Sequence, residues 1–460
     1  MEDLAEIAIQ AALNAGASFV DIRFEETHKT KLEISDGVSK TSLGQLKGAG
    51  IRAFVDGAWA FAQSAELTPA SMKRTGQQVA LTAWAIRDRV AEKFDISGPA
   101  FQDKASLKVK QKLQDVPLED KMSLVRMVDD EARAVDSRIV NTRTTYSDIT
   151  TQLFISNSLG TRVWMANSLP RLLLKITAKE NGVQQRSWGQ MFGRGGFEII
   201  DETEARETGQ KVAKLAIDLL ASKAPKGGTY DVIVNPRLNA AMVHEAFGHP
   251  CEADNWVAQT TVLEGKLGKQ VGPEFLNLSD DPTISSWRGS FEYDWEGTKT
   301  RKRCLVKDGI LTDLLHSLET AALLGMDPNG AARCQSFMFQ PIPRMSNTLM
   351  ERGEWNVDEM IADMRDGILL CDYNYGYTDS SKGQFMFQAN HGYLIEKGEK
   401  TQMIRDVSLA GQILEFLNKI DAIGDDFGMS AGMCGKANQL IPDNSGGPHA
   451  RIRQVPLGGM

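Results

Sequence analysis

The chain has 460 residues, of which 42% are hydrophobic and 24% charged, with a formal net charge of −8. This length exceeds the usual size of a single core, so we expect two domains of ordinary globular composition. The acidic balance argues against a nucleic-acid-binding surface, which needs a basic face. The five cysteines include no C-x-x-C pair and are odd in number, which argues against a disulfide framework and favours a reducing cytosol.

The start of the sequence carries acids rather than a basic segment followed by an apolar run, so it predicts no secretory signal. No window reaches 18 apolar residues, which argues against a membrane span. We therefore expect a soluble, cytoplasmic protein that binds neither membrane nor nucleic acid.

The first half of the chain alternates between helical and strand periodicity. Apolar residues at helical spacing predict helices over 2–15, 69–94, 117–135 and 201–222. Period-two patterns predict strands over 18–26, 31–35, 38–42, 51–55 and 58–63, and more strands between 138 and 188. Asp36-Gly37 and Asp56-Gly57 are typical of hairpin turns. These patterns favour an antiparallel sheet combined with long helices.

A Pro- and Gly-containing segment at 224–228 predicts a domain boundary, which gives an N-terminal domain over 1–223 and a C-terminal domain over 229–460. The C-terminal domain is expected to be rich in strands. The patterns predict strands over 230–234, 302–306, 384–387 and 393–396, and helices over 235–247, 315–324, 357–365 and 409–420. The predicted fold class is α+β in both domains.

Residues 244–254 (HEAFGHPCEAD) hold two imidazoles and three carboxylates within eleven positions. Neutral histidine is a common metal ligand, and a glutamate beside a metal-bound water is the usual proton shuttle. His244, Glu245 and His249 therefore predict metal-assisted hydrolysis. The interpretation without a metal is that they are ordinary polar residues of a helix and its cap.

The spacing of the two histidines differs from the familiar H-E-x-x-H pattern. Residues five apart lie about 140° apart on an ideal α-helix, so a straight helix would point the rings away from each other. Two solutions are open. Pro250 disfavours helix at the preceding residue, so the helix could end near Gly248 and free His249 to swing back. Alternatively, a π-bulge would bring positions i and i+5 together.

Two histidines need a third ligand, and Cys434 is the strongest candidate because thiolate is a good zinc ligand. Gly432 and Gly435 would allow the backbone a close approach, and the charge of Lys436 would favour the thiolate. The alternative is a buried, inert cysteine in a Gly-rich turn. The remaining cysteines and histidines are expected to be structural, namely Cys251, Cys304, Cys334, Cys371, His28, His316, His391 and His449.

Through most of its length the sequence resembles the TldD/TldE (PmbA) metalloprotease family, and specifically its TldD-like branch. Seven ordered blocks carry this resemblance: Gly48–Phe61, the H-E-x-x-x-H core, Glu252 with Asp254, Asp294–Thr298, Pro343–Asn347, Gly383–Phe387 and Met433–Lys436. One departure is Pro250, where many relatives have glycine. This departure puts the geometry of the helix exit in doubt rather than the ligand assignment.

The resemblance implies a zinc-dependent peptidase in which His244, His249 and Cys434 hold Zn²⁺ and Glu245 acts on the water. It also implies an extended peptide or unfolded polypeptide as substrate and a TldE/PmbA-like subunit as partner in a heterodimer, with a homodimer possible. The TldE branch lacks these ligands, so this chain resembles the catalytic side.

Substrate backbone could pair with a sheet edge, and the strand of Gln384, Phe385, Met386 and Phe387 is the candidate substrate-binding segment. Two other functions remain open. One is a non-catalytic peptide-binding or regulatory subunit, against which the retained Glu245 argues. The other is a zinc hydrolase that acts on a non-peptide amide, because nothing in the sequence identifies the substrate pocket.

Overall fold

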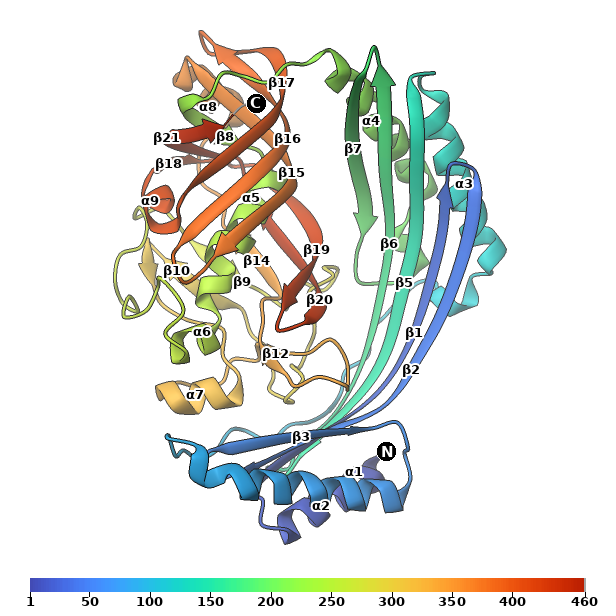
Figure 1. Cartoon of the computed structure of the whole chain (residues 1–460), viewed down its shortest axis with the longest axis vertical. Helices are drawn as coiled ribbons and strands as arrows, with labels where there is room; N and C mark the ends of the chain where they lie inside the picture. Colours follow the sequence, from blue (N-terminus) through green and yellow to red (C-terminus); the bar gives the residue numbers. More distant parts are fainter. Residues whose placement is uncertain (459–460) are drawn as a thin grey trace.

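The computed structural model describes residues 1–458, and its most extensive element is a long curved sheet (Figure 1). The strand order is β3-β2-β1-β5-β6-β4, with β7 beside β6. The strands are β1 (Phe19–Ser35), β2 (Val38–Val55), β3 (Ala58–Ser64), β4 (Gln102–Lys104), β5 (Ile139–Asn157), β6 (Arg162–Glu180) and β7 (Val183–Phe192). All neighbours are antiparallel except β4 and β6.

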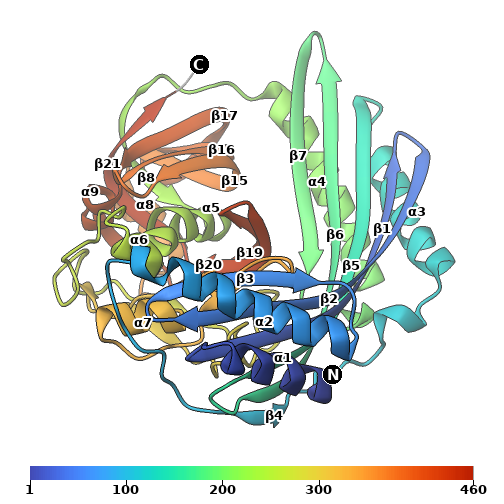
Figure 2. The same cartoon turned by 60° about the horizontal axis from the view of Figure 1, so that its bottom comes forward.

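Four helices cover one face of this sheet. They are α1 (Glu2–Asn14), α2 (Pro69–Ile86), α3 (Leu118–Ala134) and α4 (Glu202–Ala221). Side chains alternate between the faces of a strand, so the even-numbered apolar residues of β1 share a face. Those near its start, such as Ile22, pack with α1 and α2, whereas Leu32 and Ile34 pack with α3. Figure 2 shows α1 and α2 together at one end of the molecule.

The opposite face of the sheet lies against the part of the chain that follows residue 228 (Figure 1). Its contacts are buried and charged. Arg52 on β2 pairs with Asp21 on β1 and, at 2.7 Å, with Glu296. The Glu25 carboxylate accepts a 2.6 Å hydrogen bond from the backbone N–H of Phe337. Because an unpaired buried charge is costly, these pairs fix how the two parts of the chain meet.

Residues after 228 form two six-stranded sheets. The first has the order β17-β16-β15-β8-β21-β18, and β21 also pairs with β17, which closes five of its strands into a ring. Its strands are β8 (Gly228–Val234), β15 (Gly367–Asp379), β16 (Gln384–Glu396), β17 (Glu399–Gln412), β18 (Ile420–Ile423) and β21 (Ala450–Gly458).

The second six-stranded sheet has the order β11-β10-β9-β14-β20-β19, and β12 (Ala332–Arg333) and β13 (Ile342–Pro343) form a separate pair. Its strands are β9 (Leu278–Asp280), β10 (Arg303–Lys307), β11 (Ile310–Leu311), β14 (Asn347–Met350), β19 (Gly428–Lys436) and β20 (Gln439–Gly447). Five short helices accompany the strands within the described residues: α5 (Pro236–Met242), α6 (Ala253–Val257), α7 (Leu318–Leu324), α8 (Val357–Met364) and α9 (Ile413–Asn418). The predicted α+β class is confirmed.

Several predicted boundaries are wrong. The five short strands predicted between 18 and 63 are three, because β1 and β2 pair continuously through the polar stretch where the pattern breaks. The segments 384–387 and 393–396 likewise belong to one strand, β16. The predicted helix 69–94 ends at Ile86, apart from a 3₁₀ turn at 87–89. The predicted helix 409–420 is shortened to α9 because residues 409–412 continue β17.

Both predicted hairpin turns are confirmed, with positive φ at Asp36-Gly37 and Asp56-Gly57. The proposed division into domains at 224–228 stays a prediction, although the sheet of β1–β7 ends before that segment. Within residues 1–458, no helix is both long enough and apolar enough to cross a membrane.

Candidate metal centre

The two histidines lie on a helical segment that changes from α to π geometry. Asn235 caps α5 by accepting a 3.0 Å hydrogen bond from the N–H of Leu238, and Pro236 occupies the first turn, where no N–H is needed. From Val243 to Gly248 the helix is π, and the N–H of His249 reaches back to the carbonyl of His244. Of the two solutions open from the sequence, the structure has the π turn.

The expected helix end at Gly248 is therefore wrong. Gly248 and His249 keep helical dihedrals, and residues 249–251 continue as a 3₁₀ turn. Gly248 is required by close packing rather than by flexibility, since a Cβ there would lie 1.9 Å from Sδ of the buried Met345. The π turn brings the two imidazole centroids to 5.3 Å, with their planes at 84°.

Cys434 reaches the same point from strand β19. Its Sγ lies 3.5 Å from Nε2 of His249, and one ligand atom from each of His244, His249 and Cys434 lies within 4.8 Å of the others. Two imidazole nitrogens and a thiolate are ligands that zinc prefers, and their proximity would allow these three residues to hold one ion. It is the one such group found among residues 1–458.

Electrostatics favour the thiolate form of Cys434. Burial raises the pKa of its thiol, but the neighbouring His244 and His249 outweigh burial and lower the pKa to about 6. The predicted role of Lys436 is wrong. Its Nζ lies 3.0 Å from Glu252 and 2.6 Å from Asp254, so its charge is used by those carboxylates.

Each histidine has a carboxylate near its Nδ1 atom. Nδ1 of His249 shares a 3.0 Å hydrogen bond with Glu252, which is fully buried, whereas Nδ1 of His244 lies 3.2 Å from Asp443 on β20 without forming a hydrogen bond. A carboxylate at one ring nitrogen fixes the orientation of the ring and leaves the other nitrogen for a metal. The buried oxygen Oδ1 of Asp443 has no hydrogen-bond partner within the described chain.

Glu245 has the exposure that a proton carrier needs. Its side chain is 31% exposed, and its Oε2 lies 3.8 Å from Nε2 of His249. It lines a cavity of about 560 Å³ together with the three ligand residues. One wall of this cavity comes from β6 and β7 of the long sheet, and the other comes from the π turn, β15 and the β19–β20 hairpin.

Three segments of the chain match known protein domains. Residues 227–459 match the PmbA/TldA metallopeptidase C-terminal domain, residues 111–220 match the central domain of that family, and residues 20–83 match its domain 1. The chain belongs to the PmbA/TldD family.

Relatives in this family extend over nearly the whole chain. A metalloprotease of Methanothermobacter thermautotrophicus is 35% identical over 96% of this chain and 95% of its own length. A protein of Saccharolobus solfataricus, named a zinc metalloprotease TldD homolog, is 28% identical over 98% of this chain and 99% of its own length. The resemblance inferred from the seven blocks is confirmed.

Two solved structures share the fold of this chain. A Thermotoga maritima protein described as a candidate modulator of DNA gyrase superposes with a TM-score of 0.81 at 23% identity, covering 99% of this chain and 100% of its own. TldE from Thermococcus kodakarensis gives a TM-score of 0.74 at 18% identity, with 99% and 100% covered. At these identities the likeness concerns the fold alone.

Some predicted site residues lie elsewhere in this PmbA/TldD chain. Strand β16 pairs with β15 on one side and β17 on the other, so the predicted edge pairing at residues 384–387 is wrong. Phe385 and Phe387 are buried in the core, and none of residues 384–387 lines the metal cavity. Among the other cysteines and histidines, Cys251, Cys334, Cys371, His316 and His391 are buried.

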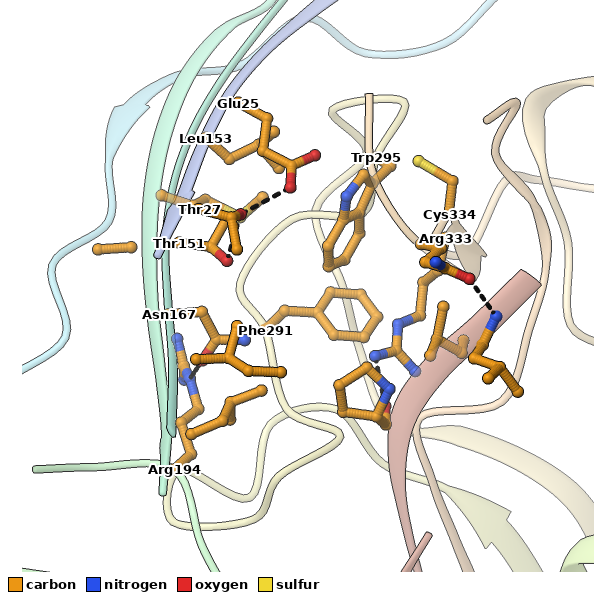
Figure 3. A pocket seen from close by; sticks show the side chains of 18 of the residues that line it. Glu25, Thr27, Thr151, Leu153, Asn167, Arg194, Phe291, Trp295, Arg333 and Cys334 are labelled. Carbon is orange, nitrogen blue, oxygen red and sulfur yellow. Dashed lines mark hydrogen bonds between the residues drawn. The ribbon is translucent and has the colours of Figure 1, made fainter. Parts of the chain in front are cut away.

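A second cavity of about 280 Å³ adjoins the first along β6, and Met433 lines both. Figure 3 shows Glu25, Thr27 and Thr151 on one side and the rings of Phe291 and Trp295 facing them. Its lining is mainly apolar. Sequence reasoning missed this cavity because its walls come from segments more than 100 residues apart.

Proposed function

We propose that this chain is a zinc-dependent peptidase that hydrolyses extended peptides or unfolded polypeptides. The observation that carries the proposal is the convergence of His244, His249 and Cys434 beside Glu245 on one wall of an open cavity. The names of the relatives, metalloprotease and zinc metalloprotease, support the same chemistry.

Each side chain of the site has a separate role in the proposed reaction. His244, His249 and Cys434 would hold zinc, which when bound supplies a Lewis acid that polarises the scissile carbonyl and acidifies water. Glu245 accepts the proton of the attacking water and passes it to the nitrogen of the leaving amine. Glu252 orients the ring of His249 through its hydrogen bond, and Asp443 is placed to do the same for His244, whose Nδ1 lies 3.2 Å away.

The shape of the cavity supports a peptide rather than a folded protein as substrate. It lies between the long sheet and the C-terminal sheets, and it holds about 560 Å³. That volume accommodates a few residues of extended chain but no globular surface. We also propose a TldE-like subunit as partner, in keeping with the shared fold of TldE. Light scattering of the chain alone and after co-expression with the candidate subunit tests this proposal. A monomer in both samples would contradict it.

The decisive experiment compares wild type with Glu245→Gln at matched zinc content. Cleavage of an unfolded polypeptide should fall by roughly 10²–10⁴-fold, because the variant keeps the size of the side chain and loses the proton acceptor. Glu274→Gln, at an exposed position away from the cavity, is the matched control. Equal metal-dependent rates in wild type and Glu245→Gln would remove Glu245 from the mechanism. Absence of any cleavage by the zinc-loaded, partnered protein would favour a non-catalytic subunit.

The ligand assignment has its own test. Elemental analysis should find one zinc per chain in wild type and none in His244→Ala/His249→Ala/Cys434→Ala. Stoichiometric metal in the triple variant would contradict the assignment. Circular dichroism of the variant checks that the fold survives.

A further inference from the structure

The wall of the metal cavity that faces Glu245 carries three cationic side chains. Arg171 and Lys175 lie four residues apart on β6, so the period of two places them on the same face, and both line the cavity. Arg186 on the neighbouring strand β7 lines it as well. Lys175 pairs with Trp188, two residues from Arg186, so their side chains are diagonal neighbours. We call Arg171, Lys175 and Arg186 the basic wall.

No carboxylate of residues 1–458 forms an ion pair with the basic wall, in which Arg171 is half-buried and Lys175 and Arg186 are exposed. Arg171 donates from Nε to the neutral amide of Gln190 at 3.0 Å. Across the cavity, Asp443 is 3.2 Å from His244, and Glu245 stands beside His249. Since the whole chain carries a net charge of −8, this group of cations is a local feature of one wall, and the carboxylates of the cavity lie on the opposite wall.

A fourth cation, Arg288, lies near Arg171, and its backbone N–H donates to the side chain of Asn444 on β20. Arg288 is only 3% exposed, and its Nε and Nη1 have no hydrogen-bond partner among the described residues. Burial, and next the nearby charge of Arg171, lower the pKa of Arg288 to about 10. The carboxylate of Asp443 partly offsets the repulsion between these two guanidinium groups, and neither of them forms an ion pair with it. An anionic group in the cavity would further stabilise Arg171, which lines it.

We propose that the basic wall binds a carboxylate of the peptide substrate, so that the enzyme favours peptides with an acidic residue or a free C-terminal carboxylate near the scissile bond. This inference rests on the proposed peptidase function. Arginine and lysine are the usual partners of carboxylates, and attraction within a partly enclosed cavity is screened less than at an open surface. The basic wall thereby supplies selectivity that the metal and Glu245 do not provide.

The neighbouring cavity shows the contrast. There Arg194 makes two 2.8 Å contacts with Glu292, and the guanidinium of Arg333 donates to the carbonyls of Met345 and Pro442. Glu25 accepts from Thr27 and Phe337. Arg194 and Glu25 are thus paired within the protein, and Arg333 is held by two carbonyls although its Nε has no hydrogen-bond partner among the described residues.

The test uses one short peptide made with Glu or Gln at each position in turn, and with its C-terminus as acid or amide. Wild type should cleave the preferred acidic form with roughly tenfold higher kcat/KM than the neutral form, and the ratio should shrink as salt rises from about 50 to about 500 mM. Lys175→Gln and Arg186→Gln should each lower the ratio several-fold. Lys179→Gln, exposed on the same strand and face but outside the cavity, is the matched control.

The outcomes are distinct. A dependence on Glu against Gln identifies a side-chain carboxylate, and a dependence on acid against amide identifies the C-terminus. Equal rates for all forms in wild type, or an unchanged ratio in both wall variants, would overturn the inference while leaving the peptidase function intact. If wild type cleaves none of the peptides, the proposed function fails instead. In that case, fluorescence anisotropy of the same peptides measures whether the basic wall binds a carboxylate. Equal Kd values for the acidic and neutral peptides would refute the inference.

Discussion

Gly248→Ala should damage the metal centre without touching a ligand. Gly248 closes the π turn that brings His244 and His249 together, and it packs on Met345, which is 0% exposed. A Cβ at this position would lie 1.9 Å from Sδ, 3.1 Å from Cγ and 3.3 Å from Cε of that methionine. Two such atoms need roughly 3.5–4.0 Å, so either the methionine or the turn must move by more than 1 Å.

The cost of this overpacking is about 1–3 kcal/mol. At about 2–4 °C per kcal/mol for a domain of 150–250 residues, the melting temperature should fall by roughly 2–12 °C. If the π turn is the part that moves, zinc affinity should fall too, because the two rings no longer converge. Thermal melting and competition with a chelator measure the two effects separately.

A second substitution tests whether the clash with Met345 causes the loss of stability in Gly248→Ala. Met345→Ala removes all three contacting atoms at its own cost of about 2–5 kcal/mol, so Gly248→Ala should cost far less in that background. Gly435→Ala is the control beside Cys434, because its Cβ would meet only Leu440, at 3.4 Å. The reasoning is refuted if Gly248→Ala lowers the melting temperature equally in both backgrounds, or changes neither stability nor zinc affinity.

Three further predictions follow from the surroundings of the site. Asp443→Asn should weaken zinc binding about 10–100-fold by releasing the ring of His244, and an unchanged affinity in chelator competition would contradict this. Burial lowers the pKa of His244, but Asp443 and other neighbours raise it to about 9. Since zinc binds only the neutral ring, the affinity of the protein for zinc should rise with pH up to about 9. A zinc affinity that stays constant between pH 6 and 9 would refute this prediction. Arg52→Met should lower the free energy of unfolding by about 3–5 kcal/mol, because it leaves Asp21 and Glu296 buried without their cation, and a denaturant midpoint like that of wild type would disprove it.

The ligand residues could be predicted from sequence because their chemistry is local. His244, Glu245 and His249 lie within six positions. Cys434 lies in a glycine-rich segment, which predicts a close approach of the backbone to the site. The pitch of the helix could not be predicted. Two backbone solutions bring the rings together, and the π turn depends on the packing of Gly248 against a residue almost 100 positions away.

Asp443 was missed because its role depends on strand register. Ala437 and Asn438 both have positive φ and form a two-residue turn, which places Asp443 opposite Gly432. The sequence of this turn lacks the Asn-Gly or Asp-Gly signal of a hairpin, so the register was not evident. Given the hairpin, the carboxylate would have been found two positions along the neighbouring strand from Cys434.

The long strands were divided by the prediction for a different reason. Residues 28–31 of β1 are polar on both faces, which breaks the period-two pattern. The strand continues because β2 and β5 pair with it on both sides through this stretch. Backbone pairing with two neighbours thus outweighs the absence of an apolar face, and only the tertiary structure shows that the neighbours are present.

The metal cavity belongs to neither half of the chain alone. Its ligands come from residues after 228, whereas the basic wall comes from β6 and β7 of the long sheet. The distance between them is therefore set by the buried contacts that join the halves, among them the pair of Arg52 and Glu296. A change at this contact should alter KM for peptides more than it alters zinc affinity, because it moves the wall relative to the metal and leaves the ligand geometry in place.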